Sequence, residues 1–574
     1  MDRRQFDSGV VMPGLEDTIR KHVLKNAYDY GKANAGAVAG KVIAEYPDAK
    51  KDMKETMKLI SKTISEVSKL SKEDIGKEMK NYEYAEKKEE KKTITLPNAE
   101  KDKVVTRFPP EPSGYPHIGH AKASWLDYEG ANVYNGKMVL RFDDTNPEKE
   151  SEEYVQAIKE GLEWLGVKWS DETYTSDNMK EIYKNLEKLF EKGKAYVCTC
   201  PRDEISARRS EGKACACRKL SEKEILGRWK GMLKGKYEPG SAIVRYAGDM
   251  KSLNTVMKDP TLARIMTAKH FRQGTEYRVW PSYDLAVAVM DHLEGITHPM
   301  RSKEYELRNE LYYALFTDLG FERPELVEFS RLAIKNAPIS KRLITPLVKE
   351  GKVSGWDDPR LPTLAGLKRR GLLPEAIKNF VLSMGLSKSE SEPGWEILLA
   401  ENRKLLDPEA KHYFFVKEPV PVVVGGLKQK VKIKLHPKKD IGFREFSVSE
   451  KIYISNDDAK QLKKGEIFRL KDLCNVKLVK KGETFEGELA EDSMVPKKIQ
   501  WVDDRDKMPC VVLVPHDMLN DDGEYNPESL EIAEGYCEKP CEKLKEGEII
   551  QFERFGFCRL DRKEKAKLQF VFSC

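Results

Sequence analysis

The 574-residue chain is predicted to fold as a multidomain α/β protein. Three observations carry this prediction. Near the N-terminus, apolar residues recur every three or four positions, which is typical of helices with one buried face. From residue 104 onward, strand-like and helix-like segments alternate, which indicates a parallel sheet covered by helices. From residue 413 onward, short strand-like runs separated by turn residues predict β-barrels.

Composition narrows the class of protein before any motif is considered. Apolar residues make up 40% of the chain, enough for several cores, and the formal net charge of +6 permits nucleic-acid binding without requiring it. No apolar run is long enough to span a membrane. The first residues lack the pattern of a signal peptide. We therefore expect a cytoplasmic protein with no membrane partner, and we do not expect its ten cysteines to form disulfides.

The first hundred residues are predicted to form a small helical domain. Two apolar stripes at helical spacing support this: Leu15, Ile19, Val23 and Ala27, then Met53, Met57, Ile60, Ile64 and Val67. The charged run AEKKEEKKTITLPNAEKDK that follows is interpreted as a solvated linker.

The stretch RFPPEPSGYPHIGHAKA, residues 107–123, lies between a predicted strand and a predicted helix. At such a junction, free backbone N–H groups and the helix dipole attract phosphate oxygens, and Gly119 allows a close approach to the backbone. His117 and His120 could donate hydrogen bonds to charge that builds on a phosphate. From these letters alone, a proline-rich turn with one buried histidine is an equally good interpretation.

Two C-x-C pairs in VCTCPRDEISARRSEGKACACRK predict a structural zinc site. Its ligands would be Cys198, Cys200, Cys215 and Cys217, because four thiolates can close a tetrahedral Zn²⁺ site. The other six cysteines, Cys474, Cys510, Cys537, Cys541, Cys558 and Cys574, are expected to pack in cores.

Several long motifs resemble those of class I aminoacyl-tRNA synthetases of the glutamyl and glutaminyl group. The HIGH stretch has the form seen in that group, and FSRLAIKNAPISKRLI resembles its second signature, KMSKS, with Pro338 in place of the first lysine. Further resemblances are RFDDTNPEKE, YDLAVAVMDHLEGITHPMRSKEYELRNELYYAL, VSGWDDPRLPTLAGLKRRG and QFERFGFCRLD. The N-terminal hundred residues resemble, more weakly, the helical extension of archaeal glutamyl-tRNA synthetases.

The resemblance implies a domain order. We expect a helical N-terminal extension and linker (1–100), a Rossmann-type catalytic core in two halves (101–195 and 277–342), a zinc-bearing acceptor-binding insertion (196–276), a helical stem-contact domain (343–410) and anticodon-binding β-barrels (411–574).

The resemblance also implies site residues. His117, His120 and Lys341 would be catalytic. The ATP-binding residues would be Pro110, Glu111, Pro112, Ser113, Gly114, Tyr115, Pro116, His117, Ile118, Gly119, His120, Ile339, Ser340, Lys341 and Arg342.

The amino-acid pocket decides between glutamate and glutamine. By resemblance, Asp143 would hold the substrate ammonium and Tyr283 would line the pocket, in which Arg301 beside Arg107 would present two guanidinium groups. Glutamyl enzymes resemble this chain in having an arginine at Arg301, where glutaminyl enzymes typically carry a small residue. Two guanidinium groups favour a carboxylate, whereas a neutral amide would leave a buried positive charge uncompensated. We therefore expect L-glutamate.

The implied reaction joins L-glutamate to tRNA-Glu, and also to tRNA-Gln, through a glutamyl-adenylate, with ATP as substrate and Mg²⁺ on its phosphates. We expect a monomer. Lys430, Lys432 and Lys434 alternate with apolar residues, so they form either a solvated strand face or a contact with the tRNA backbone. Lys368, Arg369 and Arg370 are a second candidate contact. The alternatives are a glutaminyl-tRNA synthetase, a HIGH-bearing nucleotidyltransferase of small metabolites and a non-catalytic tRNA-binding relative.

Overall fold

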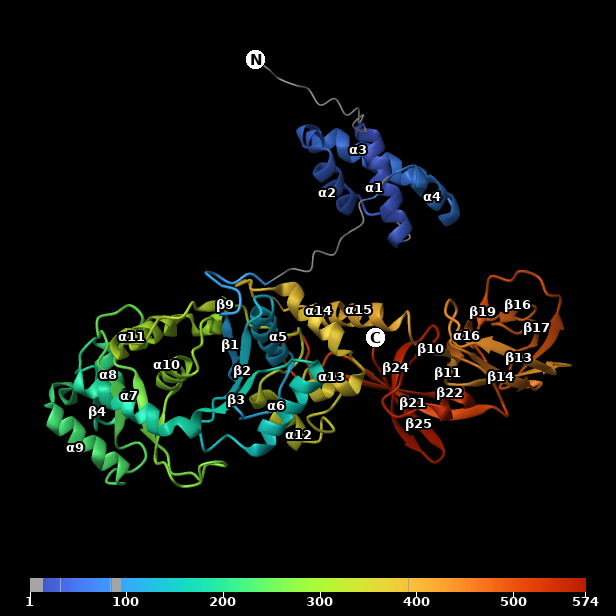
Figure 1. Cartoon of the computed structure of the whole chain (residues 1–574). Coiled ribbons are helices and arrows are strands. Elements are labelled where there is room, and N and C mark those ends of the chain that lie inside the picture. The colour runs from blue at the N-terminus through green and yellow to red at the C-terminus, as the bar shows by residue number, and fades with distance from the viewer. Residues whose placement is uncertain (1–13, 31–32, 83, 85–93, 391) are drawn as a thin grey trace, which may run out of the picture. The chain divides into compact units, whose positions relative to one another are not determined.

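The computed structural model describes residues 14–30, 33–82, 84, 94–390 and 392–574 (Figure 1). The chain divides into two compact units, Met1–Lys91 and Lys92–Cys574. Much of the predicted charged linker, residues 85–93, lies outside the described residues. Among the helices of the described ranges, none combines the length and apolar character needed to cross a bilayer.

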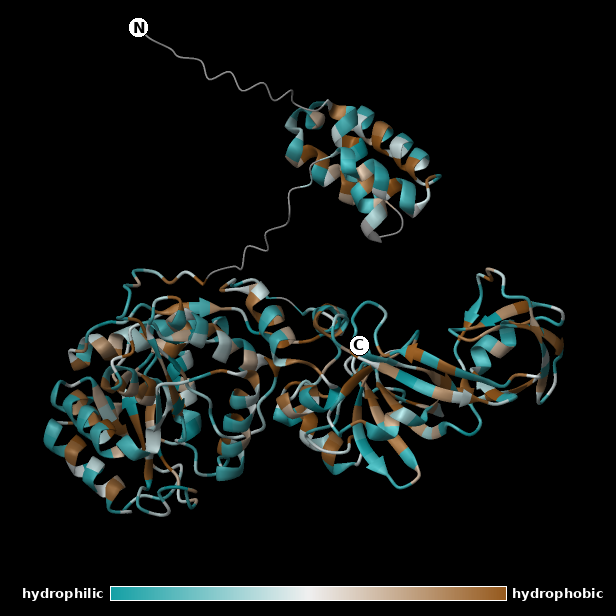
Figure 2. Ribbon diagram, turned by 45° about the vertical axis from the view of Figure 1, so that its right-hand side comes forward, coloured by the Kyte–Doolittle hydropathy of each residue, from teal (hydrophilic) through white to brown (hydrophobic). Residues whose placement is uncertain are grey.

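The first unit is helical, as predicted. Its helices are α1 (Leu15–Tyr30), α2 (Ala35–Glu45), α3 (Met53–Val67) and α4 (Lys72–Glu78). Asn34 and Asp52 cap the starts of α2 and α3 by accepting backbone N–H groups. The predicted stripes supply the core, with Ile19, Val23 and Ile60 fully buried, and Figure 2 shows apolar and hydrophilic residues interleaved on these helices. Met53 is an exception: as the first residue of α3 it is exposed.

A parallel sheet positions the site in the second unit. Strand β1 (Val105–Phe108) pairs with β2 (Lys137–Phe142), which pairs with β3 (Asp171–Tyr174), all in parallel. Strands β8 (Met300–Ser302) and β9 (Val327–Phe329) form a second parallel pair. Backbone N–H groups of Thr297 and His298 donate to the Val105 carbonyl, so β8 lies next to β1. The helices of this region are α5 (Ile118–Asn132), α6 (Glu152–Leu165), α10 (Tyr283–Leu293) and α11 (Asn309–Leu319).

An antiparallel sheet and three helices are inserted between β3 and α10. The strands β4 (Ala195–Cys198), β5 (Ile243–Tyr246), β6 (Thr261–Ile265) and β7 (Val279–Pro281) pair in that order. The helices are α7 (Met179–Glu191), α8 (Arg202–Ser210) and α9 (Glu222–Leu233). Trp229 and Trp280 are fully buried in this region's core, which also takes in α10 and α11.

A helical block follows the sheet. It consists of α12 (Lys341–Lys349), α13 (Leu364–Arg370), α14 (Pro374–Met384) and α15 (Trp395–Leu406). The candidate tRNA contact at 368–370 is mostly used for packing here. Arg369 forms an ion pair with Asp561 at 2.9 Å, and Arg370 is 3% exposed, with its guanidinium over the Trp395 ring. Only Lys368 stays exposed, because Arg369 holds α13 against β24 and Arg370 packs against the start of α15.

The C-terminal region contains two barrel-like seven-stranded sheets, ordered β10-β23-β24-β25-β21-β22-β11 and β19-β16-β17-β18-β12-β15-β20, and a hairpin, β13-β14. The first has strands β10 (Lys411–Tyr413), β11 (Phe415–Lys417), β21 (Lys507–Pro515), β22 (Leu530–Glu538), β23 (Ile549–Phe552), β24 (Gly556–Glu564) and β25 (Lys567–Phe572). The second has β12 (Val420–Gly425), β15 (Lys451–Ile454), β16 (Ile467–Leu470), β17 (Asn475–Lys480), β18 (Phe485–Ala490), β19 (Lys498–Ile499) and β20 (Val502–Asp503). The remaining elements are β13 (Gln429–Lys434), β14 (Phe443–Val448) and the short helix α16 (Asn456–Gln461).

These elements confirm the multidomain α/β class, while the finer domain boundaries stay a prediction. On β13, Lys430, Lys432 and Lys434 are exposed and Ile433 is buried, as the alternation predicts. The core assignment of the six remaining cysteines is also confirmed: five are buried, and the half-buried Cys474 packs against a core.

Candidate active site

Both histidines of the HIGH stretch cap the start of α5. The Nδ1 of His117 accepts the Gly119 N–H at 3.0 Å, and the Nδ1 of His120 accepts the His117 N–H at 3.2 Å. Burial lowers the pKa of both rings, that of His120 to about 4. Each ring is therefore neutral at physiological pH, with its proton on Nε2 as a hydrogen-bond donor.

Gly119 is required by the first histidine. A Cβ at this position would lie 2.8 Å from Cε1 of His117, closer than carbon atoms approach. The absence of a side chain at Gly119, which was predicted to make room for a ligand, makes room for the His117 ring.

A cavity of about 400 Å³ brings eight of the predicted site residues together. Its lining residues come from β1, the start of α5, α10, β8 and the segment after β9. The predicted residues among them are Arg107, His117, Gly119, His120, Tyr283, Arg301, Ile339 and Ser340. Lys122, Glu304, Tyr305 and Arg331 also line it.

Arg107 lies fully buried in a charged network at the base of this cavity. Its Nε donates to Asp291 at 3.0 Å, and its Nη1 donates to the Met300 carbonyl at 2.7 Å. Asp291 also accepts from Arg141 at 2.9 Å. Although burial opposes charge on these groups, the two arginines hold the pKa of Asp291 below its usual value. The Nη2 of Arg107 is buried with no hydrogen-bond partner among the described residues.

Arg301 has a different environment, because no carboxylate pairs with it in the described chain. It is 4% exposed, and its one hydrogen bond is a long one, from Nη1 to the Asn309 side-chain oxygen at 3.4 Å. Its Nε and Nη2 are buried without a partner among the described residues. A buried, unpaired guanidinium facing a cavity can bind a carboxylate with two parallel hydrogen bonds.

Asp143 lies at the end of β2, outside the residues that line this cavity. Its Oδ1 accepts from Arg141 at 3.0 Å and from Thr175 at 2.9 Å. The next residue, Asp144, is fully buried, and its carboxylate accepts from the backbone and side chain of Ser176 at 2.8 and 2.7 Å. The acidic stretch therefore anchors the loop after β2 to the segment after β3.

Glu150 ends this acidic stretch and is almost fully buried. Burial, reinforced by the charges of Glu111 and Asp143, raises its pKa to about 8, although the Asn146 N–H opposes the shift. The imidazole of His270 lies 3.8 Å away, and burial lowers the pKa of that ring. Glu150 is therefore protonated in the folded protein at neutral pH.

This burial predicts a pH-dependent stability. Between the unfolded pKa of a glutamate and about 8, the folded protein binds the extra proton, so the stability due to Glu150 is lost as pH rises. The free energy of unfolding should fall by at most about 1.4 kcal/mol for each pH unit, the value for one bound proton. We expect the free energy of unfolding of the wild type to fall relative to that of Glu150→Gln between about pH 5 and 8, measured by urea titration. Parallel curves would contradict the buried, protonated carboxyl.

Lys341 and Arg342 line a second cavity, of about 670 Å³, together with Glu111 and Ser113. The Lys341 ammonium donates to the Ser113 carbonyl at 2.6 Å and lies 4.5 Å from the centre of the Tyr154 ring. Lys341 thus links the KMSKS-like stretch to the segment before the two histidines. Its side chain does not line the cavity that holds the histidines.

The four predicted zinc ligands lie together at the end of β4 and in the loop after α8. Their sulfur atoms all lie within 4.8 Å of one another; two of the distances are 3.7 Å (Cys198 to Cys215) and 3.8 Å (Cys200 to Cys217). A tetrahedron with metal–sulfur bonds of about 2.3 Å has edges of about 3.8 Å. The cluster thus fits a Zn²⁺ ion.

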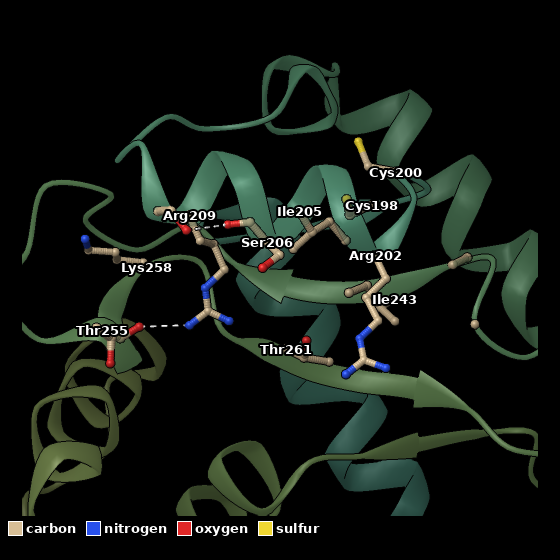
Figure 3. A pocket seen from close by; sticks show the side chains of 13 residues that line it. Cys198, Cys200, Arg202, Ile205, Ser206, Arg209, Ile243, Thr255, Lys258 and Thr261 are labelled. Carbon is tan, nitrogen blue, oxygen red and sulfur yellow. Dashed lines mark hydrogen bonds between the residues drawn. The ribbon is translucent and has the colours of Figure 1, made fainter.

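A cavity of about 560 Å³ lies beside Cys198 and Cys200 (Figure 3). Arg202, Arg209 and Lys258 supply positive charge to it, and Arg209 donates to the Thr255 carbonyl at 2.9 Å. This cavity is a candidate contact for phosphate groups.

Sequence reasoning missed Asp291 and Tyr312. Asp291 lies eight residues after Tyr283 on α10, so helical spacing placed it near the same face. A carboxylate within the apolar run of α10 was the signal that could have found it. Tyr312, on α11, had no comparable signal.

A parallel sheet with two histidines at the start of the helix after β1, and a lysine that donates to the loop before those histidines, is the arrangement of a class I aminoacyl-tRNA synthetase. The family "tRNA synthetases class I (E and Q)" matches with its catalytic domain at residues 103–408 and with its two anti-codon binding domains at residues 410–494 and 498–561. The chain belongs to this family.

Curated relatives extend over nearly the whole chain. A glutamate–tRNA ligase of Nitrosopumilus maritimus is 45% identical and covers 96% of this chain and 98% of its own. Glutamate–tRNA ligases of Cenarchaeum symbiosum (40% identical) and Pyrococcus furiosus (41%) each cover 97% of this chain and 99% of their own.

Proposed function

We propose that the chain is a glutamate–tRNA ligase that charges tRNA-Glu and also tRNA-Gln. The α-carboxylate of L-glutamate attacks the α-phosphorus of ATP, which enters as its Mg²⁺ complex, and pyrophosphate leaves. A ribose hydroxyl of the terminal adenosine of the tRNA then attacks the glutamyl carbonyl, AMP leaves and the hydroxyl proton is released. A cytoplasmic location and a monomeric state remain predictions from the sequence.

The pair of arginines carries the choice of glutamate. Arg301 and Arg107 present buried N–H groups without partners in the described chain, and both line the cavity that contains the two histidines. The charge of Arg107 is already balanced by Asp291, whereas that of Arg301 is not. The side-chain carboxylate of glutamate would supply the missing charge, and the amide of glutamine would not.

The histidines would act on the phosphate side of the same cavity. Because both are neutral Nε2–H donors held by the helix cap, they are pre-organised to donate to the α-phosphate as its charge changes. Asp143 remains the proposed partner of the substrate ammonium.

We propose that Lys341 leaves the Ser113 carbonyl to reach the leaving pyrophosphate. Lys341→Ala should therefore lower the rate of adenylate formation about 100-fold while the glutamate KM changes less than threefold. The reason is that the lysine would stabilise negative charge on the pyrophosphate that leaves in the transition state, and would not contact bound glutamate. Single-turnover kinetics measure both values, with Lys349→Ala, from the same cavity, as a control. Equal losses in rate and glutamate binding would remove this role.

The cysteine cluster would hold a structural Zn²⁺, which supplies cross-linking of the loop and no step of the reaction. We expect about one zinc per chain by elemental analysis of purified protein, and loss of that zinc with a lowered melting temperature in Cys215→Ser. The mutant Cys558→Ser, which lies in a distant core, should keep its zinc. Purified protein without zinc would contradict the site.

The acceptor end of the tRNA is proposed to lie against this insertion, with Arg202, Arg209 and Lys258 near its phosphates. The exposed lysines of β13 would contact the tRNA further along, at the β-rich domains that match anti-codon binding families.

The test of this function is charging of purified tRNA-Glu and tRNA-Gln with labelled glutamate. Glutamate on both tRNAs is the expected result. Charging of tRNA-Glu alone would remove tRNA-Gln from the proposal and mean that the β-rich domains discriminate strictly.

A further inference from the structure

The side chain of Tyr312, on α11, contacts Arg301 directly and is linked to Arg107 through Asp291. It is 1% exposed. Its hydroxyl donates to Asp291 Oδ2 at 2.7 Å, and the other oxygen of that carboxylate accepts from Arg107 at 3.0 Å. The Arg301 guanidinium lies over the face of its ring, 4.3 Å from the ring centre. The helices α10 and α11 that carry Asp291 and Tyr312 pack side by side (Figure 1).

The face of the Tyr312 ring can stabilise the buried charge of Arg301 without occupying its N–H donors, which a carboxylate could not do. A buried guanidinium needs a stabilising neighbour, but a carboxylate at this place would occupy its N–H donors and cancel the charge that a substrate is to meet. An aromatic face stabilises the cation through its quadrupole and uses no N–H donor. Arg301 accordingly keeps Nε and Nη2 free of partners in the described part of the chain.

A second contact fixes the rotation of the guanidinium on this face. The Nη1 of Arg301 points to Asn309 Oδ1 at 3.4 Å, and the amide of Asn309 donates to Glu328 at 2.7 Å. The ring and this amide together leave one edge of Arg301 directed to the cavity.

We propose that Tyr312 is a positioning residue for amino-acid selection, because its ring holds Arg301 in place and leaves the N–H donors of that arginine free for the substrate. It touches no reacting atom. This inference rests on the proposed function, because it assumes that the two arginines bind the side chain of glutamate.

The test compares Tyr312→Met with Tyr312→Phe in the full-length enzyme. Methionine fills the space with a flexible apolar chain and has no ring, whereas phenylalanine keeps the ring and loses the hydroxyl. We expect Tyr312→Met to raise the glutamate KM about 30-fold, with the ATP KM and kcat within threefold of wild type, and to lower the preference for glutamate over glutamine by a similar factor. Tyr312→Phe should restore most of this preference.

The adjacent Tyr313 provides a matched control. The guanidinium of Arg323 lies 4.1 Å from the centre of the Tyr313 ring, and neither residue lines the cavity. The Tyr313 hydroxyl donates to the Pro324 carbonyl. The Tyr313 ring also packs edge-on against the Tyr312 ring, with 5.6 Å between the ring centres. Because Tyr313→Met leaves Tyr312 its contact with Arg301, both KM values should stay within threefold of wild type. This variant removes a tyrosine that also stacks on an arginine, so it controls for loss of packing on α11.

Each outcome decides one question. A Tyr312→Met enzyme with an unchanged glutamate preference would overturn the inference, as would a loss that Tyr312→Phe shares in full. If Tyr312→Met does not fold, Tyr312→Leu takes its place, because it also removes the ring, and an unchanged glutamate preference in that variant would overturn the role of the ring. A wild type that does not charge glutamate would instead overturn the proposed function.

Discussion

Arg301→Ala is expected to lower kcat/KM for glutamate about 1000-fold in aminoacylation of tRNA-Glu. The reason is the environment of this arginine, which is buried and has no carboxylate partner in the described chain. Truncating one member of a buried, hydrogen-bonded charge pair costs about 2–5 kcal/mol, and about 4 kcal/mol corresponds to 1000-fold. The loss should be mainly in the glutamate KM, with the ATP KM little changed.

Arg323→Ala is the control, because Arg323 stacks on Tyr313 outside the cavity. Arg301→Gln adds a finer comparison, because it keeps hydrogen-bonding capacity and removes the charge. It should therefore also raise the glutamate KM. A glutamate KM in Arg301→Ala within a few-fold of the wild-type value would show that the substrate side chain binds elsewhere.

His117→Asn is expected to lower the rate of adenylate formation about 100- to 1000-fold with little loss of stability. Asparagine is among the best helix-capping residues, so it can still accept the Gly119 N–H. It cannot place a donor where Nε2 lies, and removing one such donor costs about 10²–10³ in kcat. Single-turnover kinetics and thermal unfolding, measured on the same preparation, separate the two roles.

His117→Ala is the companion variant and should lose about 1 kcal/mol of stability in addition to the rate. The rate of the wild type should show no titration of either histidine between pH 5.5 and 8, because burial lowers the pKa of both. An Asn variant that is stable and fully active would leave His117 only its capping role.

The sequence predicted the order of the structural regions because local periodicity sets helices and strands. It could not predict how the β-rich tail pairs. Strand β10 pairs with β23, more than a hundred residues later, and such pairing depends on register that only the folded chain defines. The same limit applies to Arg369 and Arg370, which were candidate tRNA contacts. Their partners in the fold, Asp561 and the Trp395 ring, are distant in the sequence, and no local pattern points to them.

In the site, the motifs located the histidines, the arginines and the cysteines, and the structure places eight of the predicted residues around one cavity. What the motifs could not give is the partner of each group. Arg107 and Arg301 look alike in the sequence, yet one is paired with Asp291 and the other lies on an aromatic ring. Lys341 was predicted to face phosphate, and its contact with the Ser113 carbonyl depends on a loop position that no local pattern encodes.

The most direct test of the glutamate site is kcat/KM of the wild-type enzyme for glutamate and for glutamine, measured by charging of tRNA-Glu. We predict a preference for glutamate of at least about 1000-fold, because in the proposed site only its carboxylate would neutralise Arg301. Equal values, or a preference for glutamine, would contradict the account of the arginine pair.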